Sequence, residues 1–201
     1  WSLTAVSFLF ATDMCAGAMM ECKNLTTVSV PVLDRIREYS YQDCSKLTKC
    51  FAPAATKVGD ETCLGCSNLK TISLPQVTTC ERRSFQNCAR LTRVSLPRVT
   101  EIGLRAFAGC KILTKISFPQ LTKFDLYAFE DCHDLKEVSL PAVEHILPAT
   151  FRERKKLKKI SLPAATVVDT EAFRGCSGIE TVSLPIATQI KEHSPLQIAP
   201  V

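Results

Sequence analysis

Eight prolines recur at intervals of 22 residues along this chain, and no other feature constrains its fold as strongly. A column of cysteines keeps the same interval nine residues ahead of the prolines, and Arg154 stands where the column breaks. Self-similarity at a fixed period of roughly 20–29 residues is typical of a solenoid, in which each repeat contacts only its neighbours. The prolines are Pro31, Pro53, Pro75, Pro97, Pro119, Pro141, Pro163 and Pro185, and the cysteines are Cys22, Cys44, Cys66, Cys88, Cys110, Cys132 and Cys176.

The repeat unit has the pattern of a short strand followed by a return segment. The best example, residues 91–110, reads LTRVSLPRVTEIGLRAFAGC. Its Val94 and Leu96 stand two residues apart, as the inward-facing positions of a strand do. Pro97 then ends the strand, because proline has no N–H to donate to a ladder. The L-x-x-V-x-L pattern predicts a leucine-rich-repeat solenoid with a parallel sheet on its concave face.

The return half of each unit carries an aromatic column, represented by Phe107, with the column cysteine three residues later. That spacing suits one helical turn with both side chains on the same face. We therefore expect short helical or extended segments on the convex face. The predicted fold is an α/β leucine-rich-repeat solenoid of about nine 22-residue turns.

The repeat pattern predicts a single domain over residues 1–201, with a degenerate first repeat at 1–21 and an irregular end at 191–201. The apolar start contains Asp13 after about a dozen residues, which is too short a run for a membrane span. Neither end has an obvious polar cap, so we expect the chain to be part of a longer protein or its ends to be covered by a partner. A net charge of +5 is too weak to predict nucleic-acid binding without a localised patch.

The unit L-x-x-I/V-S-L-P-x-V-T-x-I-x-x-x-A-F-x-x-C resembles the BspA-like, or Treponema-type, leucine-rich repeats from about Leu25 to Ile190. The resemblance implies a surface adhesion or recognition protein of a bacterium or parasitic protist that binds a host or matrix protein. It supplies no catalytic residue. An intracellular scaffold that binds a cytoplasmic partner remains the alternative, since the chain has many thiols.

The cysteines do not indicate an enzyme or a cofactor. Cys63 and Cys66 form a C-x-x-C pair, but they occupy the aromatic and cysteine columns, so the repeat explains their spacing. No paired histidines complete a tetrahedral metal site. The column thiols are expected to be reduced and buried, because neighbours about 4.8 Å apart with parallel Cβ vectors do not suit a disulfide. Cys15 lies in a polar column and is expected to be exposed.

The outward side chains of the predicted strands are the first candidate binding surface. The position four residues before each proline varies in type, whereas the position two residues later is serine in most repeats. Variable side chains on a rigid ladder suit a recognition surface. A solvated sheet face explains the pattern equally well. The candidate residues are Lys49, Phe51, Arg93, Lys115, Glu137 and Lys159.

A run of basic residues near the seventh proline is the second candidate surface. It predicts a site for a polyanion, either a sulfated glycan, an acidic protein or a nucleic acid. Nucleic acid is the weaker version, because no aromatic platform stands beside the run. The alternative is a solvated loop over a locally loosened core. The candidate residues are Arg152, Arg154, Lys155, Lys156, Lys158 and Lys159.

Overall fold

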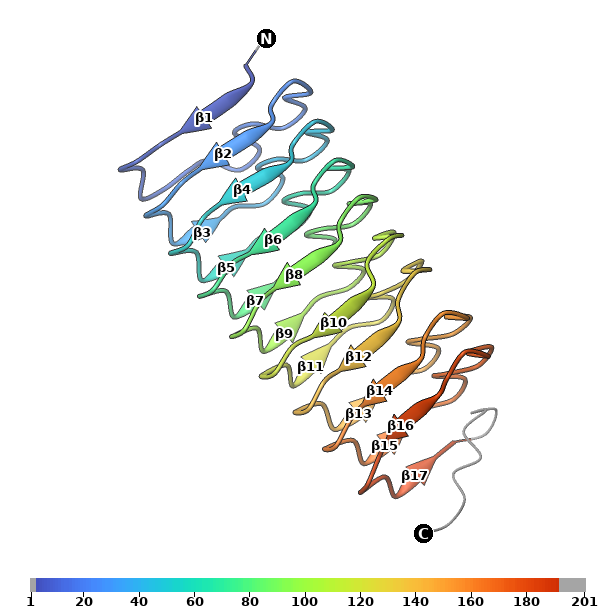
Figure 1. Ribbon diagram of the computed structural model, residues 1–201. Helices are drawn as coiled ribbons and strands as arrows, with labels where there is room; N and C mark the ends of the chain where they lie inside the picture. Colours follow the sequence, from blue (N-terminus) through green and yellow to red (C-terminus); the bar gives the residue numbers. More distant parts are fainter. Residues whose placement is uncertain (1–2, 192–201) are drawn as a thin grey trace.

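The computed structural model describes residues 3–191 as a stack of parallel turns (Figure 1). One side of the stack carries a front row of three-residue strands, one per turn. Each strand is followed in the sequence by the proline or its equivalent. The front row consists of β1 (Ala5–Ser7), β2 (Thr27–Ser29), β4 (Lys49–Phe51), β6 (Thr71–Ser73), β8 (Arg93–Ser95), β10 (Lys115–Ser117), β12 (Glu137–Ser139), β14 (Lys159–Ser161) and β16 (Thr181–Ser183).

A second row of two-residue strands runs beside the front row (Figure 1). From β2 onward, one of these strands begins eight residues after each front strand begins, once the chain has passed the proline turn. The second row consists of β3 (Arg35–Ile36), β5 (Lys57–Val58), β7 (Thr79–Cys80), β9 (Glu101–Ile102), β11 (Lys123–Phe124), β13 (His145–Ile146), β15 (Val167–Val168) and β17 (Gln189–Ile190).

All pairing between turns is parallel and keeps a register of 22 residues. In the strand register Lys115 lies opposite Glu137, for example, and Glu137 lies opposite Lys159. The front row contains three hydrogen-bonded groups, β1-β2-β4, β6-β8 and β10-β12-β14-β16. The second row contains two, β3 to β11 and β13-β15-β17. The predicted solenoid with its parallel sheet is confirmed.

A continuous apolar core fills the space between the rows and the return segments. The ring of Phe107 stacks on Phe85 with centroids 5.3 Å apart and on Phe129 at 6.0 Å. Phe151 and Phe173 continue the ladder at 5.5 Å. Backbone amides hold these rings in register, since the N–H of Phe107 donates to a carbonyl of the next turn at 2.8 Å. The predicted aromatic column therefore lies inside the protein.

Six of the seven column cysteines are buried and donate hydrogen bonds from inside this core, whereas Cys22 is half-buried. The Sγ of Cys44 donates to the carbonyl of Met19 at 3.0 Å, and the Sγ of Cys176 donates to that of Phe151 at 2.9 Å. Each acceptor lies 25 residues earlier, in the preceding turn. The hydrogen bond satisfies both the buried thiol and the backbone carbonyl, which explains why the column tolerates a weakly polar residue. All eleven cysteines are free thiols, and Cys15 is exposed as predicted.

The return segments are not helical, and the predicted helical turn is wrong for residues 3–191. Each return carries two residues with positive φ, such as Arg105 (55°) and Gly109 (74°). A right-handed helix needs a run of negative φ values, so two left-handed residues four apart prevent it. The segments from the aromatic residue to the cysteine form turns, and the two-residue strands of the second row precede them in the sequence. The predicted irregular end falls almost wholly on residues 192–201, outside the described part.

Arg154 is buried at 6% exposure, although the sequence placed it in an exposed basic patch. Its Nη2 donates to the carbonyl of Phe129 at 3.4 Å. That carbonyl is the acceptor that a cysteine at position 154 would use, 25 residues earlier. The arginine is drawn inward because the repeat assigns its position to the core, and it is not a surface contact for a polyanion.

Candidate recognition face

The outward side chains of the front strands form a surface that we call the front face. In each three-residue strand the central residue points into the core, as Ile116 and Val138 do, and the first and third residues point outward. This alternation follows from the two-residue period of a strand. The first position differs from turn to turn, whereas the third is serine in every front strand except β4, where it is Phe51.

The structure brings three of the predicted residues together at the first position. Lys115, Glu137 and Lys159 occupy neighbouring strands in direct register. The Nζ of Lys115 lies 3.0 Å from a carboxylate oxygen of Glu137, and this hydrogen bond lowers the pKa of the carboxyl group. The Lys115 side chain is exposed and that of Glu137 is partly exposed, so a ligand can compete with this pair. Arg93 lies one turn before Lys115.

Small serine side chains leave the front face hollowed at three places. A groove of about 330 Å³ lies over β10, β12, β14 and β16, beside Ser139 and Ser161. A second hollow of about 670 Å³ lies between Arg93 and Lys115, and a third of about 380 Å³ lies beside Lys49 and Phe51. Each hollow combines a charged first-position side chain with an open serine position.

Phe51 is the apolar exception on the front face. The residue is 56% exposed, and its neighbour in register is Ser29. Exposed phenylalanine next to Lys49 gives this end of the face an apolar contact that the other hollows lack. Phe51 and Lys49 are separated from Arg93 by the intervening strand β6, so the predicted residues form two groups along the face.

The six residues of the predicted polyanion patch do not all lie on one surface. Lys155, Lys156, Lys158 and Lys159 are exposed, whereas Arg154 is buried. Arg152 is exposed but pairs with Glu171 at 3.2 Å in the return segment. The four lysines lie just before β14 and at its first residue, and they form part of a larger group of basic side chains.

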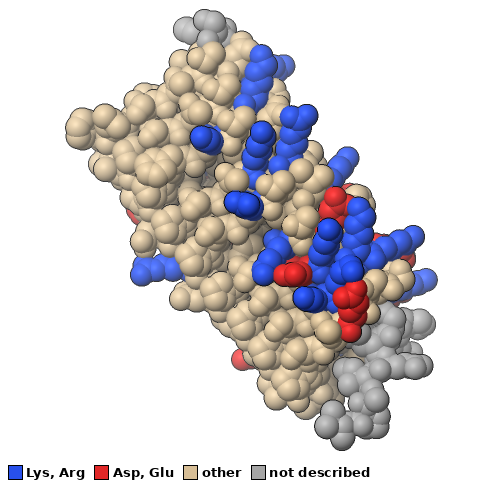
Figure 2. All heavy atoms as spheres, viewed as in Figure 1, with Lys and Arg blue, Asp and Glu red and all other residues tan. Residues whose placement is uncertain are grey.

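That group is a band of basic side chains where the front strands begin (Figure 2). We define the basic stripe as the lysines and arginines in the five-residue segments 23–27, 45–49, 67–71, 89–93, 111–115, 133–137 and 155–159. Its residues are spread over seven repeats, so the contiguous basic run at 152–159 contains only its last segment. Its members are Lys23, Lys46, Lys49, Lys70, Arg90, Arg93, Lys111, Lys115, Lys136, Lys155, Lys156, Lys158 and Lys159, and all are exposed.

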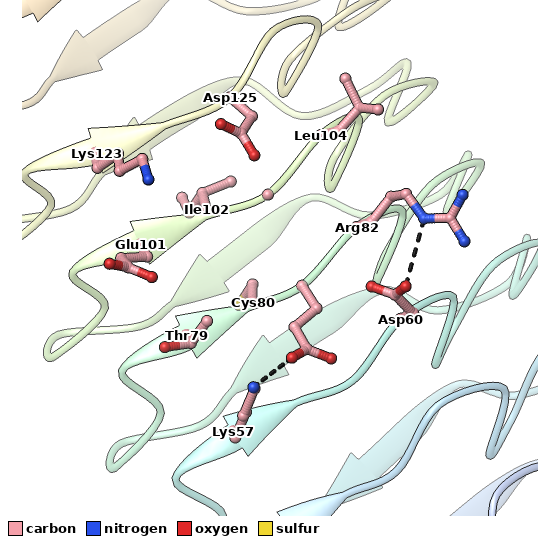
Figure 3. A pocket seen from close by; sticks show the side chains of 12 residues that line it. Lys57, Asp60, Thr79, Cys80, Arg82, Glu101, Ile102, Leu104, Lys123 and Asp125 are labelled. Carbon is pink, nitrogen blue, oxygen red and sulfur yellow. Dashed lines mark hydrogen bonds and ion pairs between the residues drawn. The ribbon is translucent and has the colours of Figure 1, made fainter.

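A groove over the second row is electrostatically different (Figure 3). It measures about 390 Å³ and is lined by acidic and basic side chains from four turns. Lys57 pairs with Glu81, and Arg82 lies 3.4 Å from Asp60. Because these four charges pair with one another, the groove offers a ligand less uncompensated positive charge than the basic stripe does.

Within residues 3–191 the side chains form no cluster of three or more His, Cys, Asp or Glu that could hold a metal ion. No helix in this part of the chain is long and apolar enough to cross a membrane.

The profile of the BspA type leucine-rich repeat region matches residues 11–98 and 78–194, in six copies. The chain belongs to this family. BspA-type repeats stack as leucine-rich-repeat solenoids, which typically present a continuous surface for binding other proteins. No curated protein matches the chain.

Solved structures share this BspA-type fold at low sequence identity. A leucine-rich repeat protein from Bacteroides ovatus is 19% identical, with a TM-score of 0.56 over 93% of this chain and 70% of that one. The T. pallidum leucine-rich repeat protein is 21% identical, with a TM-score of 0.57 over 88% and 71%. The pneumococcal vaccine antigen PcpA is 15% identical, with a TM-score of 0.57 over 80% of this chain and 51% of that one. These likenesses show the fold.

Proposed function

We propose that this chain is a non-enzymatic protein-binding module of a cell-surface or secreted recognition protein, and that its front face contacts the ligand. The observation that carries the proposal is the front face itself. A rigid ladder holds first-position side chains of different charge beside open serine hollows. Such a surface can be varied at one position per turn without disturbing the core.

Phe51 and Lys49 are proposed as one contact group, and Arg93, Lys115, Glu137 and Lys159 as the other. Exposed aromatic residues and arginines are enriched among the residues that dominate binding energy at protein interfaces. Phe51 is 56% exposed and Arg93 has no carboxylate partner among residues 3–191. Both can therefore contact a ligand without first breaking an internal interaction.

The buried thiols are compatible with a location outside the cell. Burial raises the pKa of the Cys44 thiol to about 12 and that of Cys176 to about 11. The thiolate is the reactive form of cysteine, so these side chains are protected from oxidation while the protein is folded. A pneumococcal vaccine antigen shares the fold, which supports a surface location.

The front face can be tested with a variant that keeps the net charge. Phe51→Ser removes the apolar contact, and Ser95→Gln with Ser139→Gln fills two hollows. A matched control, Leu126→Ser with Thr79→Gln and Ser177→Gln, makes the same types of change elsewhere on the surface. Binding to a panel of purified extracellular matrix proteins is measured for both, after circular dichroism confirms folding.

We expect the front-face variant to lose at least about 1.5 kcal/mol of binding free energy, a loss typical of contacts that dominate an interface. The control should bind like the wild type. Equal binding of all three proteins, or no binding of the wild type to any matrix protein, would contradict the proposal. Detection of the protein by antibody only after cells are permeabilised would favour the intracellular scaffold.

A further inference from the structure

Basic and acidic residues are unevenly distributed between the basic stripe and the rest of the protein. The segments at positions 23–27 and their equivalents through 177–181 hold 13 basic and 3 acidic residues, a net charge of +10. The rest of the chain holds the other 12 basic and 17 acidic residues, a net charge of −5, which together give the total of +5. A basic surface on an otherwise acidic protein indicates an anionic partner.

The basic side chains inside and outside the stripe differ in their partners. Only three of the thirteen stripe residues form an ion pair with a carboxylate among residues 3–191. They are Lys115, Lys156 and Lys158. Outside the stripe, eight of the twelve basic side chains are paired. Ten stripe charges are therefore exposed and not neutralised by the protein.

The fold arranges these charges in a line. Seven consecutive turns, from the one containing β2 to the one containing β14, each contribute at least one stripe residue. Adjacent turns are about 4.8 Å apart, so the stripe extends for about 29 Å along the stack. Neighbouring side chains support this arrangement, since Arg90 donates to Asn68 at 2.9 Å and Lys46 donates to Asn24 at 3.0 Å.

We propose that the basic stripe binds a linear sulfated polysaccharide of the glycosaminoglycan class, laid along the stack across successive turns. A linear polyanion with regularly spaced charges matches a linear array that adds one or more cations per turn. The glycan is a second ligand beyond the protein bound at the front face, although the two surfaces share the first-position cations.

The composition of the stripe favours a sulfated glycan over the other polyanions. Eleven of its thirteen members are lysine. Lysine is depleted at protein interfaces, and arginine is preferred where planar, bidentate recognition of phosphate is needed. Single-stranded nucleic acid also requires successive aromatic platforms, and Phe51 is the only aromatic residue in the described front strands. A polysaccharide needs neither feature.

The test compares two variants that each remove three positive charges and leave the core and the front-face positions unchanged. The stripe variant is Lys70→Gln, Lys111→Gln and Lys136→Gln, taken from three different turns. The control is Arg35→Gln, Arg98→Gln and Lys123→Gln, three exposed cations outside the stripe that also have no ion pair among the described residues. Heparin binding is measured by calorimetry in about 0.15 M salt, where charges more than about 8 Å apart are largely screened.

We expect the stripe variant to bind heparin about tenfold more weakly than the wild type, with a shallower dependence on salt, because three contacts are lost. The control should bind within about twofold of the wild type. Heparin oligosaccharides should bind more tightly as they lengthen, until they span the stripe.

Three results would overturn the proposal. Equal losses of heparin affinity in both variants would show that heparin is attracted by net charge and not by the basic stripe. Binding abolished by Lys155→Gln, Lys156→Gln, Lys158→Gln and Lys159→Gln but unaffected in the stripe variant would confine the site to one turn. Tighter binding of duplex DNA or polyglutamate than of heparin, at equal concentrations of charge, would identify another class of polyanion. Because heparin is the probe, failure leaves the proposed protein ligand unaffected.

Discussion

The Nη2 atom of Arg154 lies 3.4 Å from the carbonyl oxygen of Phe129, and this contact repeats one made by cysteine in the neighbouring turns. The Sγ of Cys132 donates to Phe107 at 3.3 Å, and the Sγ of Cys176 donates to Phe151 at 2.9 Å. The arginine keeps the hydrogen bond of its column but places a cation in the core, where its Nε has no hydrogen-bond partner.

Replacing this cation with the residue of its column should stabilise the protein. Arg154→Cys removes a buried charge and an unsatisfied N–H while retaining a donor for Phe129. We expect the free energy of unfolding to rise by about 1–3 kcal/mol. Urea denaturation monitored by circular dichroism measures the change. Arg154→Ala, which leaves a void and no donor, should not stabilise, and a lower midpoint for Arg154→Cys would contradict this explanation.

The stacked rings should account for a large share of local stability. Phe107 is fully buried between Phe85 and Phe129, whereas Phe51 is 56% exposed. Phe107→Ala should lower the free energy of unfolding by about 3–5 kcal/mol, because it leaves a cavity in the ladder. Phe51→Ala should change it by no more than about 0.5 kcal/mol. Similar urea midpoints for the two variants would be inconsistent with a buried ladder.

Gly109 is favoured by its backbone conformation and by the side chain of Asn87 in the preceding turn. Its φ is +74°, and a Cβ there would lie 2.4 Å from the Oδ1 of Asn87. Gly109→Ala should cost about 1–3 kcal/mol through both effects. In an Asn87→Gly background the clash is absent, so the same substitution should cost only about 1–2 kcal/mol. A double-mutant cycle measures the difference, and strict additivity would exclude the side-chain clash.

Asp169 should link stability to acid pH. Hydrogen bonds from Lys191, at 2.7 Å, and from His145, at 3.0 Å, lower the pKa of its carboxyl group in the folded state. A lowered folded pKa means that the stabilisation is complete above the unfolded pKa of about 3.9 and is lost as pH falls through the folded value.

The comparison with Asp169→Asn isolates this contribution. The wild type should be more stable than the variant at about pH 6, and the difference should shrink as the pH falls from about 5 to 2. Thermal melts across this range measure it. A difference that does not depend on pH would show that the carboxylate charge contributes nothing.

Much of the fold can be predicted from the sequence because each column repeats. Val94 and Leu96 mark an inward strand face in one turn, and their equivalents mark it in the others. The adjacency of Lys115 and Glu137 follows directly, since residues 22 apart occupy the same position in neighbouring turns. The ring ladder follows from Phe107 and its equivalents in the same way.

The backbone of the return segments is harder to predict. Positive φ at Arg105 is not apparent from the side chain, because arginine rarely adopts this conformation, and inter-turn hydrogen bonds impose it here. The burial of Arg154 is hard to predict because arginine is usually exposed, and the repeat overrides that preference here. The place of Lys70 and Lys136 in the basic stripe is also hard to predict, because their neighbours in the stripe are distant in the sequence and lie close only across turns.

The most direct test of the repeating core counts thiols that react with a chromogenic disulfide reagent. Eight of the eleven cysteines are buried and Cys15 is exposed. Burial raises the pKa of the Cys132 thiol to about 12, so that side chain should not react in the folded protein. The account predicts rapid reaction at Cys15, protection of the eight buried thiols, and eleven reactive thiols after unfolding in urea. Rapid reaction of several buried cysteines, or fewer than eleven thiols in unreduced, unfolded protein, would contradict it.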